Sequence, residues 1–297
     1  MDPTFPAIHC PVCQSDRLHF ALRVKDHSVS GEYFDIWECD QCSFRFTANA
    51  PAADQIGRYY QSDNYISHSN TREGLVNSLY HRVRVHTLRT KYKLICSATG
   101  LKQGAHLDIG AGTGAFVQYM NQQRWKSTGI EPDDTARAVA LKDHQTQLLP
   151  ADALAELQPS SFDAVSLWHV LEHVHDLYPY LAQIKKILRP SGRAFIAVPN
   201  YTSYDAKKYG ANWAAYDVPR HLYHFSSASM KWLVNAAGLK LIRIQPMWFD
   251  SFYISLLSEQ YAKGRSSLVS GFLTGAISNI NALFNRERCS SLIYIIG

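Results

Sequence analysis

A nine-residue stretch constrains this chain more than any other: His106-Leu107-Asp108-Ile109-Gly110-Ala111-Gly112-Thr113-Gly114. Its first half predicts a short buried strand, and its second half predicts a glycine-rich turn that opens a helix at Ala115. The three glycines let the backbone turn tightly and approach a ligand, because no Cβ stands in the way. The helix N-terminus adds free N–H groups and the positive end of the helix dipole. The stretch therefore predicts a nucleotide-type binding site at a strand end.

Two cofactors fit this turn, and the acid at position 108 distinguishes them. The pattern Gly110-x-Gly112-x-x-Ala115 satisfies the loose dinucleotide fingerprint, so NAD has to be considered. A carboxylate at Asp108 would repel a pyrophosphate, which needs donors and positive potential. It favours instead a ligand with an ammonium and a sulfonium group, as S-adenosylmethionine (SAM) has. The residues thus predict a SAM site.

The run Asp108 to Gly114 resembles the first motif of the class I SAM-dependent methyltransferases. The resemblance covers the chain from about residue 104 to the end. It implies a Rossmann-like α/β fold: a seven-stranded sheet with helices on both faces and an antiparallel seventh strand. The residues agree, because strand and helix patterns alternate here as in a doubly wound parallel sheet. We expect a methyltransferase domain over 104–297, after a connector and long helix over 49–103.

Further cofactor contacts are expected along this domain. Glu131 ends a short strand 21 residues after Gly110, where a carboxylate can accept both ribose hydroxyls. For Asp152 with the Ala153 N–H the resemblance implies an adenine contact, whereas the residues alone also allow a helix N-cap. The resemblance further implies that Trp168, at the end of the clearest buried strand, forms part of the active-site wall. The predicted cofactor-binding residues are Asp108, Gly110, Ala111, Gly112, Gly114, Glu131, Asp152, Ala153, Trp168, Tyr65 and His68.

Tyr65 and His68 belong to a polar connector over 48–70 that also contains Tyr59 and Tyr60. In the methyltransferases that the chain resembles, the segment before the first strand often folds over the SAM site. These side chains are therefore candidate cofactor or substrate contacts. Aromatic packing between two modules explains them equally well.

The N-terminus holds two CxxC pairs, Cys10/Cys13 and Cys39/Cys42. Two such pairs about 25 residues apart can present four thiolates to one tetrahedral zinc ion. Strand-prone aromatic sequence lies between and after them, so we expect a small zinc ribbon over 1–48 with structural Zn²⁺. A redox or disulfide pair is the competing interpretation.

The run His169-Val170-Leu171-Glu172-His173 follows the buried strand and matches the H-x-x-E-H zinc-protease pattern. No third ligand is apparent in the sequence, and V-L-E-H after this strand is common in the methyltransferases that the chain resembles. The resemblance places His169 beside the transferred methyl group. Glu172 and His173 are expected to cap or brace the next helix.

A lid insertion is expected over 200–225, where polar aromatic residues follow a strand end. Its last part is similar to the E-H-x-x-Y-F-S run of zinc-ribbon sugar C-methyltransferases, in which the histidine acts at the substrate. His221 matches, while Arg220 replaces the acid and His224 replaces the tyrosine. A neutral histidine suits a general base, so His221, His224 and His169 are the predicted catalytic residues. The two lid histidines could equally serve only to order the lid, and Arg220 could pair with a substrate anion.

Composition sets the remaining expectations. The chain has 297 residues, 46% hydrophobic and 19% charged, with a formal charge of +5 but no dense Lys/Arg run. We see no signal peptide and no span of ~18 apolar residues, and paired CxxC motifs suit a reducing cytosol, so a cytoplasmic protein is expected. The expected activity is SN2 methyl transfer to a small-molecule acceptor, a sugar or related metabolite. The alternative is an rRNA or tRNA methyltransferase whose ribbon binds RNA. The oligomeric state is open.

Overall fold

The computed structural model describes residues 9–60, 75–265 and 267–297. These form two compact units. The first unit combines Met1–Asn64, Leu171–Leu177 and Ala197–Tyr294, and the second combines Tyr65–Val170, Tyr178–Ile196 and Ile295–Gly297. The N-terminal segment thus shares a compact unit with most of the C-terminal third of the chain.

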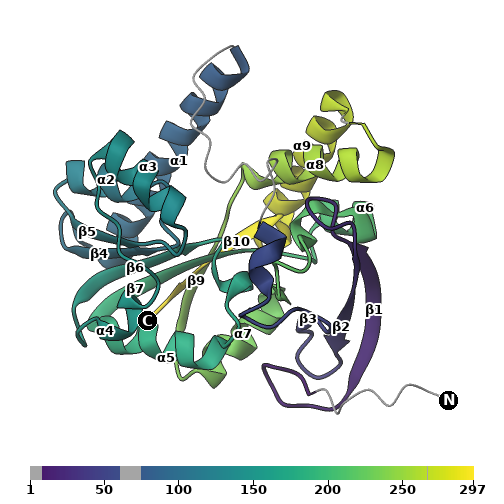
Figure 1. Cartoon of the computed structure of the whole chain (residues 1–297), viewed down its shortest axis with the longest axis horizontal. Helices are drawn as coiled ribbons and strands as arrows, with labels where there is room; N and C mark the ends of the chain where they lie inside the picture. Colours follow the sequence, from purple (N-terminus) through teal and green to yellow (C-terminus); the bar gives the residue numbers. More distant parts are fainter. Residues whose placement is uncertain (1–8, 61–74, 266) are drawn as a thin grey trace. The chain divides into compact units, whose positions relative to one another are not determined.

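Ten strands are named in the described residues (Figure 1): β1 (Leu18–Lys25), β2 (Tyr33–Cys39), β3 (Arg45–Thr47), β4 (Ala105–Ile109), β5 (Lys126–Ile130), β6 (Phe162–Trp168), β7 (Leu188–Pro199), β8 (Tyr223–His224), β9 (Leu241–Pro246) and β10 (Ser291–Ile296). The α-helices are α1 (Leu75–Thr99), α2 (Ala115–Gln122), α3 (Asp134–His144), α4 (Ala153–Glu156), α5 (Leu177–Ile187), α6 (Tyr204–Tyr209), α7 (Ser227–Ala236), α8 (Asp250–Lys263) and α9 (Leu268–Phe284). Short 3₁₀ turns are η1 (Ile56–Tyr60), η2 (Leu171–His173), η3 (Gly210–Asn212), η4 (Ala214–Tyr216) and η5 (Arg286–Arg288).

The main sheet has six strands in the order β5-β4-β6-β7-β10-β9, which confirms the predicted α/β methyltransferase fold class. β4 pairs in parallel with both β5 and β6, so that Leu107 lies opposite Thr128 and Val165. After β5, the segment at Leu149 makes only a single parallel bridge, to Ile130. In the residues that the structure describes, the sheet therefore has six strands, one fewer than the resemblance implied.

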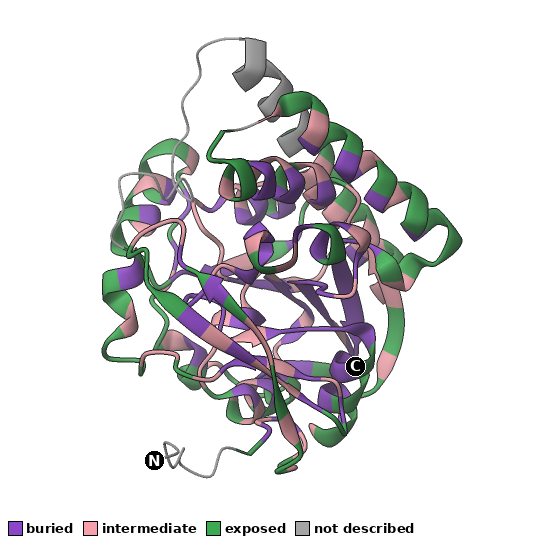
Figure 2. Cartoon of the chain, turned by 90° about the vertical axis from the view of Figure 1, so that its right-hand side faces the viewer, coloured by how far each residue is buried: buried purple, intermediate pink, exposed green. Residues whose placement is uncertain are grey.

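The inner strands are buried because their residues are apolar or paired. Four consecutive β4 residues, His106 to Ile109, are at most 3% exposed. β10 is buried along its whole length. Figure 2 colours the buried residues purple, and several strands in the middle of that view are largely purple. Two polar residues of β4, His106 and Asp108, thus lie in the interior.

The strand β7 begins earlier than the sequence indicates. Proline, serine and glycine in the run Arg189 to Gly192 are typical of a turn, yet this run lies in the strand, which begins at Leu188. A Cβ at Gly192 would lie 2.9 Å from the Phe162 carbonyl oxygen. Glycine is therefore used here for close approach between backbones within the strand region.

The first unit contains a second, antiparallel sheet in the order β1-β2-β3-β8. Its last pair joins segments far apart in the chain, since Phe46 of β3 lies opposite Tyr223 of β8. The hydrophobic cluster of this unit contains aromatic residues from the expected lid, including Trp213 and Tyr216, both 2% exposed. The structure thus gives the aromatic residues of 200–225 a packing role.

The hairpin of α8 and α9 packs through small residues. Gly271 and Gly275 of α9 face α8 so closely that an added Cβ would lie 2.9 Å from the Leu256 and Phe252 Cα atoms, respectively. The large apolar residues of α9 are exposed, namely Leu268, Val269, Phe272, Leu273, Ile277, Ile280, Leu283 and Phe284. α9 is thus a surface helix. None of the helices in the described ranges combines the length and apolarity needed to span a bilayer.

Candidate functional site

The glycine loop after β4 takes the tight conformation that the sequence predicts. Gly110, Gly112 and Gly114 all have positive φ, at 70°, 54° and 75°. A Cβ at Gly110 would lie 2.4 Å from Cγ2 of Val170, whereas one at Gly112 would meet nothing within 4 Å. The first glycine is therefore required by packing as well as by backbone conformation, and the second by conformation alone.

Asp108 ends a buried chain of hydrogen bonds that crosses three strands. The Ser166 hydroxyl donates to Asp108 Oδ1 at 2.5 Å, and His106 Nε2 lies 2.9 Å from that hydroxyl. His106 Nδ1 lies 2.7 Å from the Ser127 hydroxyl. Because the Ser166 hydroxyl donates its proton to Asp108, it can only accept from His106. His106 Nε2–H therefore donates to the Ser166 hydroxyl, and His106 Nδ1 accepts from the Ser127 hydroxyl. Every donor in this chain therefore points toward the Asp108 carboxylate.

The charge states in this chain follow from burial. Burial raises the pKa of Asp108 to about 7, although the Ser166 hydrogen bond and the Lys91 charge act to lower it. Burial also lowers the pKa of His106 to about 3, so its imidazole is neutral. Asp108 is thus a carboxyl that a bound cation would help to ionise, which fits the ammonium of SAM.

Glu131 ties the glycine loop to the next helix. Its Oε2 accepts the Gly112 N–H at 2.7 Å, and its Oε1 accepts the Asp133 N–H at 3.1 Å. The side chain is 7% exposed. A carboxylate oxygen can accept more than one hydrogen bond, so both oxygens keep lone pairs for ribose hydroxyls. The predicted ribose contact stays a prediction, with the carboxylate held at the loop.

Aromatic rings lie beside this loop in the second unit. Phe116, in the first turn of α2, packs edge-to-face on Trp168 at 5.9 Å. Lys91 Nζ lies 4.3 Å from the centre of the Trp168 ring. Lys91 lies in α1, and sequence reasoning missed this contact because no local pattern links the lysine to a tryptophan 77 positions later. His169 follows Trp168 with φ of 59°, a conformation that non-glycine residues seldom adopt.

The other predicted cofactor residues make contacts within the protein, or lie outside the described residues. Ala111 N–H donates to the Ile130 carbonyl at 3.0 Å, and Ala153 N–H donates to the Pro150 carbonyl at 3.2 Å. Asp152 stands at the N-cap position of α4 and is exposed, but its side chain makes no capping hydrogen bond. Tyr65 and His68 lie outside the residues that the structure describes. The contacts predicted for these residues stay predictions.

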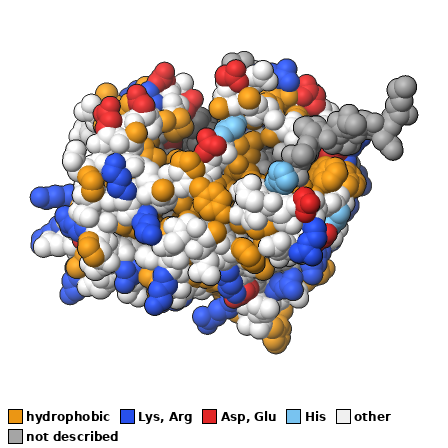
Figure 3. Space-filling model, turned by 90° about the horizontal axis from the view of Figure 1, so that it is seen from below, with side chains coloured by type: hydrophobic (Ala, Val, Ile, Leu, Met, Phe, Trp, Pro, Cys, Tyr) orange, Lys and Arg blue, Asp and Glu red, His pale blue; other side chains and the backbone are white. Residues whose placement is uncertain are grey.

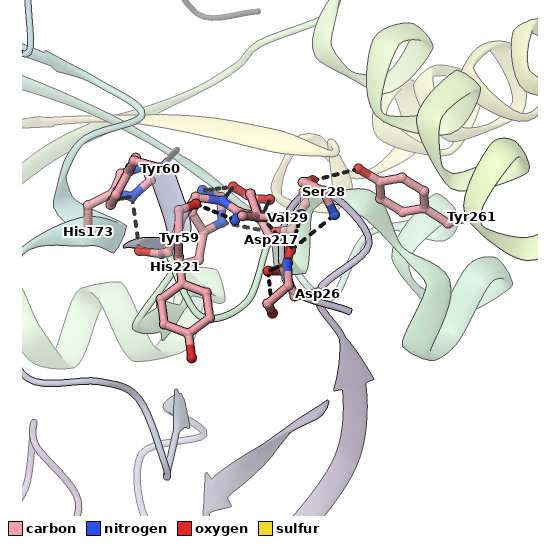
Figure 4. Close-up of polar contacts among 12 residues, drawn as sticks. Asp26, Ser28, Val29, Tyr59, Tyr60, His173, Asp217, His221 and Tyr261 are labelled. Carbon is pink, nitrogen blue, oxygen red and sulfur yellow. Dashed lines mark hydrogen bonds and ion pairs between the residues drawn. The ribbon is translucent and has the colours of Figure 1, made fainter. Parts of the chain in front are cut away.

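A cluster of histidine and acidic side chains lies within the first unit (Figure 4). His173 and His221 pack edge-to-face with ring centres 4.7 Å apart. His221 Nδ1 lies 2.9 Å from the Ala215 carbonyl oxygen, and His173 Nδ1 lies 3.0 Å from the Arg220 carbonyl oxygen. A carbonyl can only accept, so each Nδ1 carries a proton, and Nε2 is the nitrogen that has the lone pair when the ring is neutral. Burial lowers the pKa of His173 to about 4, which keeps that ring neutral.

Arg220 has a structural role beside this cluster. It is 1% exposed, and its guanidinium donates to Asp217, to Asp26 and to the Tyr59 carbonyl. Burial works against ionisation of Asp217, but hydrogen bonding and the charge of Arg220 hold the pKa of that carboxyl below its usual range. The guanidinium is thus committed to internal partners, and the expected pairing with a substrate anion is replaced by a buried ion-pair network.

The second histidine of the expected lid, His224, lies in β8 and is 4% exposed. Its Nε2 lies 3.2 Å from the Thr47 hydroxyl, and burial lowers its pKa well below the ordinary value. The same hydroxyl donates to the His221 carbonyl at 2.9 Å. These contacts hold β3 against the 221–224 segment, while the predicted catalytic role of His224 is untested.

The four N-terminal cysteines converge. Their sulfur atoms all lie within 4.8 Å of one another, and none of the four is in a disulfide. The shortest Sγ–Sγ distances join one CxxC pair to the other: Cys10–Cys42 at 3.5 Å and Cys13–Cys39 at 3.4 Å. Four thiolates at this spacing fit a tetrahedral metal site better than a redox pair.

Comparison with known proteins agrees with this geometry. A family model described as a methyltransferase domain matches residues 80–244, more than half of the chain. A ubiquinone biosynthesis O-methyltransferase from Aeromonas salmonicida is 31% identical over 173 residues, which cover 54% of this chain and 71% of that protein. A protein of the same name from Idiomarina loihiensis is 26% identical over 52% of this chain and 69% of its own length.

Two solved structures share the fold at low sequence identity. The Haemonchus contortus phosphoethanolamine N-methyltransferase 2 in complex with SAM has a TM-score of 0.52 at 19% identity, covering 85% of this chain and 61% of that one. A putative sarcosine dimethylglycine methyltransferase from Galdieria sulphuraria also has a TM-score of 0.52, at 13% identity, covering 72% and 87%.

The glycine loop, the buried acid behind it and the match over residues 80–244 lead to one conclusion. The chain belongs to the methyltransferase-domain family and is a SAM-dependent methyltransferase.

Proposed function

We propose that this enzyme transfers the methyl group of SAM to a hydroxyl oxygen of a small molecule, and that the His173–His221 pair activates that hydroxyl. The observation that carries the proposal is the pair of Nε2 lone pairs, each fixed by an Nδ1–H donated to a backbone carbonyl. The hydroxyl acceptor is supported by the O-methyltransferase names of the relatives. A sugar hydroxyl remains within this class of acceptor.

On the SAM side, Asp108 would pair with the ammonium group and Glu131 would accept the ribose hydroxyls. Phe116 and Trp168 would shield the reacting end from water. SAM supplies an electrophilic methyl group when bound. In the transfer the C–S bond breaks with its electron pair going to sulfur, the C–O bond forms, and the hydroxyl proton leaves to the histidine pair or to solvent. Positioning the two reactants in line carries much of the rate.

We further propose that Cys10, Cys13, Cys39 and Cys42 hold a structural Zn²⁺. The support is the convergence of four thiols at the ends of the β1–β2 hairpin and the loop before β3. Such a metal would supply folding free energy to a segment with little core of its own. Zinc analysis of the purified protein, with Cys39→Ser as the comparison, tests this assignment.

Turnover of SAM to S-adenosylhomocysteine tests the activity, with catechols and nucleotide-activated sugars as probe acceptors and total RNA as the competing substrate. His221→Asn is expected to keep SAM affinity but lose about 10²–10⁴-fold in rate, as for removal of an acid–base group. Glu131→Gln is expected to weaken SAM binding itself by about tenfold or more.

Methylation of RNA alone would instead favour the nucleic-acid alternative. Figure 3 argues against that outcome on the face it shows, since its Lys and Arg side chains are spaced among neutral and apolar ones instead of forming one dense patch. A His221→Asn enzyme with the wild-type rate would remove the histidine pair from the mechanism.

A further inference from the structure

The histidine pair has a third neighbour with ligand chemistry. The side chains of Glu172, His173 and His221 each offer one donor atom, and these donor atoms all lie within 4.8 Å of one another. Glu172 is fully buried and His221 is 9% exposed. Two of the three residues come from η2, and the third comes from a segment 48 positions later, so the grouping is produced by the fold.

Both imidazoles are oriented as metal ligands usually are. A histidine that binds a metal through one ring nitrogen typically donates the other N–H to a backbone carbonyl or a carboxylate, which fixes the tautomer and the ring plane. Here both Nδ1–H groups are donated to carbonyls, those of Ala215 and Arg220. The two rings pack edge-to-face at 80°, so neither ring is stacked on the other.

The charges around this position suit a cation. Asp217 Oδ2 lies 4.0 Å from His221 Nε2, and Asp26 Oδ1 lies 3.1 Å from Arg220 Nη2. The single positive charge of Arg220 is outnumbered by the carboxylates of Asp26, Asp217 and Glu172. Tyr60, whose hydroxyl lies 3.0 Å from His173 Nδ1, adds a polar contact behind the ring and brings no charge.

We propose that Glu172, His173 and His221 form a binding site for a divalent first-row transition metal ion, separate from the four-cysteine cluster. Two histidines and one carboxylate leave coordination positions open, as in facial-triad sites. Ligand atoms around such an ion lie roughly 3–4 Å apart, so small side-chain adjustments close the observed spacing. This inference deepens the proposed function, because a hydroxyl that coordinates the ion would lose its proton to solvent near neutral pH.

The choice of probe follows from ligand softness. Thiolate sites favour zinc, while imidazole and carboxylate donors also accept harder ions such as Mn²⁺. The full-length protein is therefore first loaded with zinc at its cysteines and then titrated with Mn²⁺, and the electron paramagnetic resonance signal of free Mn²⁺ is followed. One Mn²⁺ is expected to bind per chain. Glu172→Gln and His173→Asn are expected to weaken this binding at least tenfold.

His175→Asn is the matched control, since it removes a histidine from the same loop that is not one of the three ligands. It is expected to bind Mn²⁺ as the wild type does. SAM affinity, measured on all variants, reports whether each has folded. The inference is overturned if the zinc-loaded wild type shows no saturable Mn²⁺ binding, or if His175→Asn weakens binding as much as the ligand variants do.

The activity itself is tested separately. Undiminished methyl transfer by protein shown to carry no metal at this site would remove the ion from the mechanism and leave the proposed function intact. Binding of Mn²⁺ at this site by a protein that methylates no hydroxylated acceptor would support the metal site and contradict the proposed function.

Discussion

At the scale of single residues, the glycine loop offers a matched pair of substitutions. Gly110→Ala places a Cβ 2.4 Å from Val170, whereas Gly112→Ala meets only its positive φ. We expect Gly110→Ala to weaken SAM binding by well over tenfold. Gly112→Ala should lose less, since backbone strain alone costs about 1 kcal/mol. Isothermal titration calorimetry measures both.

Val170→Ala supplies the control for this pair. It removes the methyl group that the new side chain would strike, so the double variant Gly110→Ala/Val170→Ala should recover part of the lost affinity. Equal losses for the two glycine variants, with no recovery in the double variant, would contradict the packing argument.

The hydrogen-bond chain behind Asp108 leads to a second prediction. Ser166→Ala removes the hydroxyl that stabilises the carboxylate, so the pKa of Asp108 should rise above about 7. SAM affinity is expected to increase with pH as Asp108 ionises, and in Ser166→Ala this increase should shift to higher pH. At pH 7 the loss should be roughly tenfold, the value of a hydrogen bond to a charged group.

The other end of this hydrogen-bond chain, at Ser127, is expected to have a smaller effect on SAM affinity. Ser127→Ala should weaken binding less than Ser166→Ala, because His106 stands between Ser127 and the carboxylate. Affinities that do not change between pH 6 and 8 would show that Asp108 is ionised throughout and that the chain does not control it.

At the scale of elements, the α8–α9 hairpin depends on its small residues. Gly275→Leu would force side-chain atoms into the backbone of Phe252, so overpacking should destabilise the protein by about 1–3 kcal/mol. Leu273→Ala changes the same helix on its exposed face and should stay within about 0.5 kcal/mol. Urea unfolding compares the two, and equal effects would mean that the hairpin tolerates separation.

Elements with local rules were predictable from sequence. The glycine loop is one, and the helix after Ser226 is another: the serine side chain accepts the Ser229 N–H, as an N-cap should. The segment at Leu149 is different: it makes one bridge to Ile130, and pairing with a neighbour decides whether such a segment extends into a strand. Local propensity does not contain that information.

The candidate site was predictable only in part, for a related reason. The role of Asp108 follows from its charge and position, so it could be read from the motif. The grouping of Glu172 and His173 with His221 brings together residues that are 48 positions apart in the sequence, and no local spacing encodes it. Arg220 shows the same dependence on the fold. In the sequence its charge looks available to a substrate, but in the structure the guanidinium pairs with Asp26, almost 200 positions earlier.

At the scale of the whole molecule, Asp108 should couple stability to pH. Its folded pKa, about 7, is raised above the ordinary 3.8, so the native state holds a proton that the unfolded chain releases. Stability from this group is therefore complete below pH ~4 and lost as pH rises through 7. His106, with its pKa lowered to about 3, has the opposite slope below pH ~6.5 and masks the effect in the wild type.

Asp108→Asn isolates this coupling, because it keeps the shape of the side chain and removes the titration. In the absence of SAM, we expect the free energy of unfolding of the variant to increase relative to that of the wild type as pH rises, by roughly 2–3 kcal/mol between pH 5 and 8. Urea unfolding at both pH values measures the difference. A constant difference would show that Asp108 does not titrate in this range, and added SAM should reverse the order of stability at pH 8.

The pairing of β3 with β8 imposes a delay during synthesis. Phe46 leaves the ribosome about 180 residues before its partner Tyr223, which at ~5–20 residues per second amounts to roughly 10–35 s. For that interval β3 has an unpaired edge, the kind of strand that recruits other chains. Ion capture by the nearby thiols could fold the hairpin meanwhile, so the yield of soluble protein should depend on zinc supply while the chain is still being made.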